Sequence, residues 1–311
     1  MTDIVSISFR DDSFILTELS KNENTIDIQR AVHKKLPLFI NHKSIQESAT
    51  IQQIASALAE VSKDLNLPEK SVHVTIPGRF ALIKKIFLDG SIPSDNVKNL
   101  ANFEFEKLWD ETRQNYHVYL TEEPSDKNND DIIAVAIRKK TLEFYNSLFQ
   151  EIKIDPEIIS LSCFTVEELL KKAFPDSTGQ SLLLGWQRRG LEAILSENEK
   201  FVSYRFQSYN KKYDPIETIS EFDLANAFST LLQELKKPKG LSEDLFQIQT
   251  IYNFGYYFKP EWLDFMRSRT KIPINLFNFD TSSKYTLKIS ESAMNSEQVY
   301  RFIEPLSNAF N

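Results

Sequence analysis

A chain of 311 residues with 41% hydrophobic side chains is long enough for two packed domains, which excludes a single small core. The formal net charge is −7, and Lys and Arg are spread along the chain, which argues against nucleic acid as a partner. The single cysteine, Cys163, excludes an intrachain disulfide and fits a reducing compartment.

The beginning of the chain predicts neither a secretion signal nor a membrane anchor. Residues 1–9 lack a basic segment followed by a long apolar stretch. Apolar runs elsewhere fall far short of the roughly 20 residues that a membrane-spanning helix needs. We therefore expect a cytoplasmic protein. We also expect Cys163, within the apolar run 158–164, to be a buried small side chain rather than a nucleophile.

The first 175 residues predict alternating strands and helices. Alternating apolar side chains or short apolar runs predict strands at 4–9, 14–19, 25–32, 72–77, 79–88, 116–120, 132–137 and 158–164. Apolar residues spaced three or four apart predict helices at 51–65, 94–109, 140–152 and 166–174. We expect Thr50 to be the N-cap of the first helix and Leu108 to lie on the buried face of the second.

A second half follows the expected linker at 175–179. It predicts strands at 181–186, 191–195, 201–206, 248–254 and 273–277, and helices at 216–235, 260–269 and 299–310. Each half opens with a hairpin, adds a third strand and continues into alternating strands and helices. The sequence therefore predicts an α/β fold of two similar halves, with mixed sheets covered by helices.

The first hairpin turn, residues 8–12, lies where such a fold would hold a phosphate. Backbone N–H groups can surround a phosphate only where side chains do not block the approach, and no glycine precedes Gly78. Asp11 and Asp12 would add negative charge beside a phosphate. Their carboxylates have the chemistry to bind a metal ion, but paired Asp residues are also common turn formers, and we expect the turn role.

Two further loops have the position of a nucleotide site. The turn at 184–190 holds Arg188 and Arg189, which have the chemistry to bind a phosphate or an acidic partner, although a solvated turn is the simpler expectation. Gly255 ends a strand where an adenosine could lie, yet Tyr256, Tyr257 and Phe258 would fill that place. No P-loop, metal-ligand pair or Ser-His-Asp arrangement is evident, so we expect no catalytic residue and no metal site.

The order of these elements resembles the PilM family, the actin-like, FtsA-related proteins of type IV pilus assembly. Residues 72–78 (VHVTIPG) and 83–88 (IKKIFL) resemble the family's strand, IPG turn and next strand, and 251–277 resembles a later strand, double glycine, helix and strand. The resemblance implies a duplicated actin-like (ribonuclease H-like) α/β fold with an inserted small α+β subdomain. It assigns 1–70 and 141–175 to the first half, 71–140 to the inserted subdomain, 180–285 to the second half and 286–311 to a C-terminal helix returning to the first half.

The family's nucleotide-binding signature is degraded in this chain. Family members that bind nucleotide begin with an Asp-x-Gly turn, and the corresponding residues here are Ser8 and Arg10. A second Asp-x-Gly corresponds to Gly185 and Gln187, and the double glycine to Gly255 and Tyr256. We therefore expect no cofactor, little or no binding of ATP with Mg²⁺, and vestigial loops at Ser8, Arg10, Asp11, Asp12, Gly185, Gln187 and Gly255.

The resemblance implies a non-catalytic scaffold. PilM-like proteins lie at the cytoplasmic face of the inner membrane and hold the N-terminal tail of a membrane protein resembling PilN, in a groove between the first half and the inserted subdomain. We expect Arg79, Phe80, Phe103 and Trp109 at that groove, since Phe103 and Trp109 fall off the buried stripe of their helix. Packing of these aromatic rings against a neighbouring strand is the alternative. The protein would meet the membrane only through its partner, and a homo-oligomer stays open.

Two other functions stay open. An actin-like ATPase or sugar kinase would need the Asp and Gly loops that are missing. A GspL-like secretion component that still binds ATP would carry a transmembrane helix after the actin-like part, and none is evident before Asn311.

Overall fold

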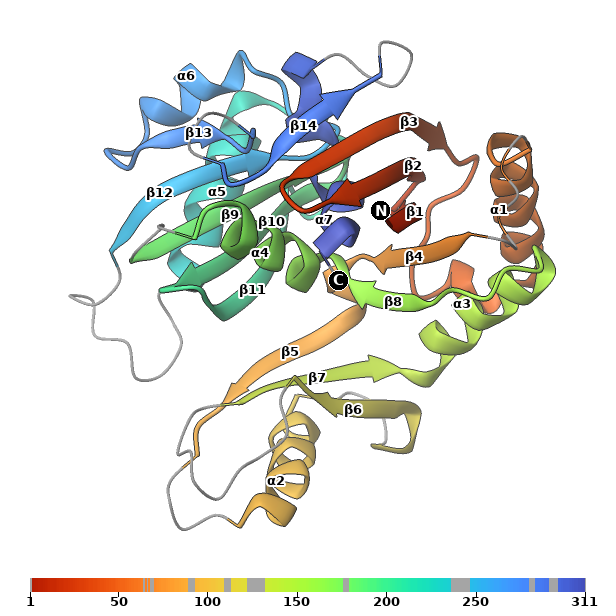
Figure 1. Cartoon of the computed structure of the whole chain (residues 1–311). Coiled ribbons are helices and arrows are strands. Elements are labelled where there is room, and N and C mark those ends of the chain that lie inside the picture. The colour runs from red at the N-terminus through yellow and green to blue at the C-terminus, as the bar shows by residue number, and fades with distance from the viewer. Residues whose placement is uncertain are drawn as a thin grey trace.

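The computed structural model describes residues 2–63, 65, 67, 70–88, 93–108, 113–121, 132–175, 179–235, 247–279, 283–290 and 296–310. Within these residues the strands form sheets of six, five and three strands. The two larger sheets form the two halves of the molecule. The smallest sheet projects from the first half with one helix beside it (Figure 1).

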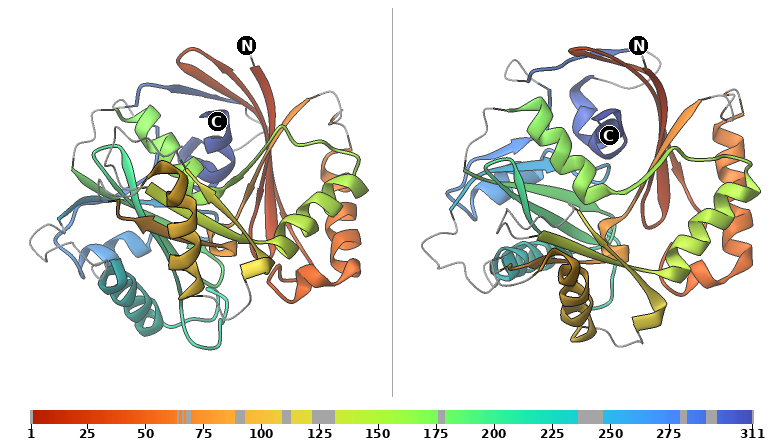
Figure 2. Two further views of the ribbon diagram at one scale, coloured as in Figure 1. Left: turned by 90° about the horizontal axis from the view of Figure 1, so that it is seen from below. Right: turned by 60° about the horizontal axis from the view of Figure 1, so that its bottom comes forward.

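The first half is built on the six-stranded sheet, ordered β14-β3-β2-β1-β4-β8. Its strands are β1 (Thr2–Phe9), β2 (Ser13–Asn22), β3 (Thr25–Lys35), β4 (Ser71–Ile76), β8 (Ile158–Leu161) and β14 (Thr286–Ile289). Alternation along β1 sets the layers, because Val5, Ile7 and Phe9 enter the apolar core on one face while Ser6 accepts a hydrogen bond from Asn308 on the other. Helices α1 (Ser48–Val61) and α3 (Lys139–Glu151) cover the first face, and the C-terminal helices the second (Figure 2).

The second half is built on the five-stranded sheet, ordered β11-β10-β9-β12-β13. Its strands are β9 (Gln180–Gln187), β10 (Gly190–Glu197), β11 (Lys200–Ser208), β12 (Ile248–Phe254) and β13 (Ile274–Leu276), with helices α5 (Glu221–Leu235) and α6 (Trp262–Arg267) packed around them. Helix α4 (Ser162–Ala173) contacts β4, β8 and α7 (Ile303–Ser307) on the side of the first half, and β10 and β11 of the second. The predicted helix at 216–235 begins only at Glu221. The reason is a capping box, in which the Asp223 N–H donates to Ser220 Oγ and the Ser220 N–H donates to Asp223.

The inserted block consists of β5 (Ala81–Ile86), β6 (Tyr116–Leu120), β7 (Ile132–Arg138) and α2 (Ser94–Glu106), with the strand order β5-β7-β6. Ala134 and Ala136 of β7 face α2 in a small core, whereas Ile133, Val135 and Ile137 join the main core. The predicted start of this block at residue 71 is too early, because β4 pairs with β1 and β8 inside the six-stranded sheet.

The C-terminal segment packs on the first half, and it is not one helix. It begins with β14, which pairs in parallel with β3. A 3-10 turn (Ser296–Phe302), the short α7 (Ile303–Ser307) and a second 3-10 turn (Asn308–Phe310) replace the predicted helix at 299–310. Pro305, which has no N–H, interrupts a continuous ladder there. Helix α7 contacts β1, β2 and α4.

Two expectations for helical side chains are wrong. Leu108 is 55% exposed, because α2 ends at Glu106 and the chain turns back there, with the Leu108 N–H donating to the Phe105 carbonyl. Thr50 lies inside the first turn of α1, whose N-cap is Glu47. Cys163 is buried, as expected.

Candidate functional site

The first hairpin turn is packed into the interior. Arg10, Asp11 and Asp12 are each at most 3% exposed. Their backbone groups are occupied too: the Arg10 N–H donates to Ser13, the Leu36 N–H to the Asp12 carbonyl at 2.7 Å, and the Ile40 N–H to the Asp11 carbonyl. This loop is therefore a packed part of the first half.

The guanidinium of Arg10 forms an ion pair with the C-terminal helix. Its Nη2 lies 2.5 Å from Oε2 of Glu304, and both side chains are 1% exposed. The Ser8 hydroxyl donates to the same carboxylate oxygen at 3.5 Å. Ser8 and Arg10, the two residues that correspond to the first signature turn, are thus both directed at Glu304.

The two aspartates of the turn also meet arginines. Asp11 lies 2.6 Å from Arg79, and Asp12 lies 2.7 Å from Arg188 of the second half. The Tyr257 hydroxyl also donates to Asp12, at 3.1 Å. Burial raises the pKa of Asp11 to about 6, against the lowering effect of Arg79. Ion pairs with arginine therefore take the place of the expected simple turn role.

The second hairpin turn is not simply solvated, contrary to expectation. Arg188 is 20% exposed and bridges Asp12 to Glu217. The Arg189 guanidinium stacks 4.4 Å from the ring centre of Phe39 and donates to the Tyr213 carbonyl at 2.6 Å. These arginines therefore join the second hairpin turn to the first half, through Asp12 and Phe39.

A carboxyl group fills the space beside Gly185. Glu192 lies opposite Gly185 in the β9–β10 pair, and a Cβ added at Gly185 would lie 2.5 Å from Cγ and Oε1 of Glu192. The Gln187 amide donates to Glu192 and to Glu304, both at 2.8 Å, and the Tyr204 hydroxyl donates to Glu192 at 3.3 Å. Arg10, Gln187, Glu192, Tyr204 and Glu304, which we call the cleft network, thus form one buried set of contacts.

Burial, and then the nearby carboxylate of Glu304, raise the pKa of Glu192 to about 8. The Glu192 carboxyl is therefore mostly protonated near neutral pH, which lets two carboxyl groups lie close together with only one guanidinium beside them.

Sequence reasoning missed Glu192 and Glu304. The available signal was a lone acidic residue inside an apolar run, LEAIL for Glu192 and FIEPL for Glu304.

The third loop needs its glycine for backbone packing. Gly255 has φ +115°, and a Cβ there would lie 2.7 Å from the Trp186 carbonyl oxygen. Tyr256 stacks on His33 with ring centres 3.6 Å apart, and Phe258 is fully buried. Aromatic side chains thus occupy the place that the sequence marks as a possible adenosine cradle.

The described residues hold no group of three or more His, Cys, Asp or Glu side chains arranged to bind a metal ion. No described helix is long and apolar enough to cross a bilayer.

A pocket of about 390 Å³ opens between the first half and the inserted block. Its walls come from the 3-10 turn Ser44–Gln46, the end of β7, the start of α3 and the turn before β6. The lining residues are His42, Ile45, Gln46, Asn115, Arg138, Lys139, Lys140 and Glu143. We call this the subdomain pocket. None of the residues predicted for the partner groove lines it.

The four predicted groove residues are not brought together. Phe103 is 55% exposed on α2, with Lys107 Nζ 4.3 Å above its ring. Phe80 is 4% exposed and belongs to the core, and Arg79 reaches inward to Asp11 and to the ring of Phe39. Neither Arg79 nor Phe80 therefore presents its side chain to an open groove. Trp109 lies outside the described residues.

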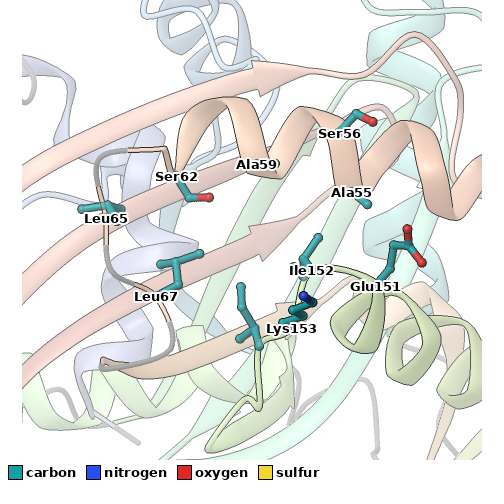
Figure 3. Close-up of a pocket in the computed structure, with 10 residues that line it drawn as sticks. Ala55, Ser56, Ala59, Ser62, Leu65, Leu67, Glu151, Ile152 and Lys153 are labelled. Carbon is teal, nitrogen blue, oxygen red and sulfur yellow. The ribbon is translucent and has the colours of Figure 1, made fainter.

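A second pocket of about 460 Å³ lies between α1 and the segment that follows α3 (Figure 3). Ala55, Ser56 and Ala59 of α1 form one wall, and Ile152 and Lys153 the opposite one. Eight of its ten lining residues are uncharged, so it offers little to select a particular ligand.

Known proteins resemble the chain in sequence and in fold. A family model described as type IV pilus assembly protein PilM matches residues 6–185. No curated protein sequence matches. Among solved structures, a PilM–PilN type IV pilus biogenesis complex is similar at a TM-score of 0.72 and 12% identity, over 98% of this chain and 97% of that one.

Two further structures share the fold. The cytoplasmic domain of EpsL, an inner membrane component of the type II secretion system of Vibrio cholerae, has a TM-score of 0.56 and 8% identity, over 100% of this chain and 96% of that one. A Bacteroides thetaiotaomicron protein with an actin-like ATPase fold has a TM-score of 0.53 and 12% identity, over 99% and 95%. The predicted actin-like α/β fold is therefore confirmed, and the chain belongs to the PilM family of type IV pilus assembly proteins.

Proposed function

We propose that this PilM-family chain is a non-catalytic scaffold that holds the cytoplasmic tail of an inner-membrane protein resembling PilN. It would lie at the cytoplasmic face of the inner membrane through that partner. A solved relative is described as a complex of PilM with PilN, which supports a protein partner of this kind.

The observation that carries the non-catalytic part is the Arg10–Glu304 pair. Arg10 stands at the glycine position of the first signature turn, where an ATP-binding relative needs open backbone. Its side chain is buried against Glu304 at 2.5 Å. Opening this place for a phosphate would expose or separate a buried ion pair, which is costly.

Calorimetry with ATP and Mg²⁺ tests this part directly. We expect no heat of binding at micromolar nucleotide, because the cleft network and the Asp12–Arg188 pair occupy the cleft. A dissociation constant in the micromolar range, measured on a sample whose thermal unfolding is cooperative, would contradict the proposal.

The subdomain pocket is the site we propose for the partner. It lies between the first half and the inserted block, where the resemblance places the partner groove, and Ile45 gives it an apolar wall beside polar and charged groups. Such a mixture suits one short peptide segment better than a flat interface.

The partner site is tested with a peptide that covers the N-terminal cytoplasmic tail of a PilN-like protein. Gln46→Trp would fill the pocket, and we expect it to weaken binding at least tenfold. Gln53→Trp, on an exposed position of the neighbouring α1, is the matched control and should bind as the wild type does. Equal binding by both variants would exclude the pocket.

The same binding assay also tests whether the exposed ring of Phe103 contacts the partner, with the variant Phe103→Ala. If Phe103→Ala binds the tail like the wild type, the end of α2 is outside the partner site. A loss confined to Phe103→Ala would move the site to α2.

An ATP-binding ATPase or GspL-like component is the alternative function. The similarity to the EpsL domain shows a shared fold and does not separate the two proposals. The ATP titration separates them, because only the alternative requires nucleotide binding.

A further inference from the structure

The subdomain pocket carries a positive charge that contrasts with the rest of the chain. The chain has a formal net charge of −7. The pocket nevertheless gathers Arg138, Lys139 and Lys140 against one acidic side chain, Glu143, with His42 at its edge. The excess of positive charge is therefore local, and it lies in a recess between two parts of the fold.

The position of these side chains adds to the imbalance. Lys139 and Lys140 form the first turn of α3, and the N-cap, Arg138, makes no side-chain capping hydrogen bond. The first turn also holds no acidic residue. The N-terminal end of a helix carries partial positive charge and free N–H groups, so cations there are unfavourable and an anion is favoured.

The contacts of the two lysines do not neutralise this charge. The Lys140 ammonium donates to the amide oxygen of Gln46 at 3.2 Å, a neutral acceptor. No ion pair or hydrogen bond of the Lys139 ammonium occurs among the described residues, although its side chain is only partly exposed. The neighbouring Arg138 donates to the Tyr116 hydroxyl at 3.1 Å.

We propose that the subdomain pocket receives an acidic side chain of the partner segment, an Asp or Glu whose carboxylate binds Lys139 and Lys140 at the start of α3. An apolar neighbour in the same segment would contact Ile45, which is 6% exposed. Charge complementarity selects this occupant, because a basic or neutral segment would leave the two lysines unpaired. This inference rests on the proposed function, since it names the chemistry of the segment that the same site holds.

A random dodecapeptide library displayed on phage tests the inference and does not require the sequence of the partner. Selection on the full chain should enrich Asp or Glu next to an apolar residue. The same selection on the double variant Lys139→Gln/Lys140→Gln should lose that enrichment. The matched control is Lys211→Gln/Lys212→Gln, an adjacent pair of exposed lysines on a turn of the second half, and it should select as the wild type does.

A synthetic copy of the most enriched peptide gives the quantitative arm. We expect Lys139→Gln/Lys140→Gln to bind it at least tenfold more weakly, and Lys211→Gln/Lys212→Gln within twofold of the wild type. Replacing the acidic residue of the peptide by its amide should cause a similar loss, and higher salt should weaken binding to the wild type. Circular dichroism melting of each variant checks that the fold is intact.

The outcomes separate this inference from the function on which it rests. Acidic peptides that bind wild type and Lys139→Gln/Lys140→Gln equally would overturn the inference. Enriched peptides without acidic residues that are lost with Gln46→Trp would overturn it too, while leaving the pocket as a peptide site. If no selected peptide responds to Gln46→Trp, or none is selected, both proposals fail.

Discussion

The Arg10 guanidinium and the Glu304 carboxylate lie 2.5 Å apart in the interior, and they come from opposite ends of the chain. The pair ties the first hairpin turn to the C-terminal helix. Through Gln187, which donates to Glu304 at 2.8 Å, it also ties both to the second half. Contacts between the chain's own side chains thus join three distant segments at one buried place.

Arg10→Met should destabilise the protein by about 3–5 kcal/mol, because Glu304 would remain as an uncompensated buried charge. The double variant Arg10→Met/Glu304→Leu should recover much of that loss, since both charges are then removed together. Urea unfolding followed by circular dichroism measures both values. If the double variant is less stable than the single one, the two charges do not act as a pair.

Stability should fall as the pH rises from 6.5 to 8, by about 1–2 kcal/mol, because of Glu192. Burial and Glu304 raise the pKa of Glu192 in the folded state to about 8, above its ordinary value of 4.5. The folded state therefore holds a proton that the unfolded state has already lost. The stabilisation that this proton gives is fully present below the pKa that Glu192 has in the unfolded state. It is lost as the pH rises through the pKa that Glu192 has in the folded state.

Two other shifted groups contribute less than Glu192 in this window. Burial raises the pKa of Asp11 to about 6, so Asp11 changes protonation mainly below pH 6.5, and burial lowers the folded-state pKa of His33 from 6.5 to about 4, so unfolded His33 adds only a small slope of opposite sign near pH 6.5. Glu192→Gln, which imitates the protonated carboxyl, should flatten the profile in urea unfolding. Glu199→Gln, on an exposed turn, should keep the wild-type slope. An unchanged slope in Glu192→Gln would place the effect elsewhere.

Arg188→Gln should lower the free energy of unfolding by about 1.5 kcal/mol, since it removes the 2.7 Å contact with Asp12 between the halves. This value is at the lower end of the range for hydrogen bonds between charged groups, because Arg188 is 20% exposed and water screens the pair. Arg205→Gln, on β11, removes an arginine without an ion pair among the described contacts and is the control. Amide hydrogen exchange should show faster exchange around residues 10–13 only in Arg188→Gln.

Gly255→Ala should cost about 1–3 kcal/mol, because its φ of +115° disfavours a side chain and the new Cβ would meet the Trp186 backbone at 2.7 Å. Gly179→Ala is the matched comparison. Its φ is also positive, at +78°, but the added Cβ would meet the flexible side chain of Gln249. The melting temperature of Gly255→Ala should therefore be lower than that of Gly179→Ala. The reverse order would show that the backbone at Trp186 shifts at little cost to make room for the Cβ.

Local patterns predicted most elements because they depend on neighbouring residues. The alternation at 4–9 and 14–19 became β1 and β2, and the turn between them placed Arg10, Asp11 and Asp12 at the cleft. Gly185 and Gln187 lie on β9, in the corresponding hairpin of the second half. Gly255 directly follows β12, which pairs with β9, so all three residues lie near that turn.

The strand order and the partners of the buried charges could not be predicted from the sequence, because both depend on pairing between distant segments. Nothing local shows that β4 inserts beside β1, or that Glu304 and Arg79 are the partners of Arg10 and Asp11. The resemblance placed a groove between the first half and the inserted subdomain, but it did not identify the residues that line the subdomain pocket, because Gln46 and Lys139 become neighbours only after α3 packs beside the first 3-10 turn.

The pairing of β14 with β3 has a consequence for how the molecule can be divided. The chain passes from the first half to the second near residues 175–180 and returns before Thr286. A single cut between Pro175 and Gly179 would therefore leave two fragments, the second of which still contributes β14 and α7 to the first half. The two pieces should remain associated and should reassemble when produced separately, so this junction is the natural place for a split-protein reporter.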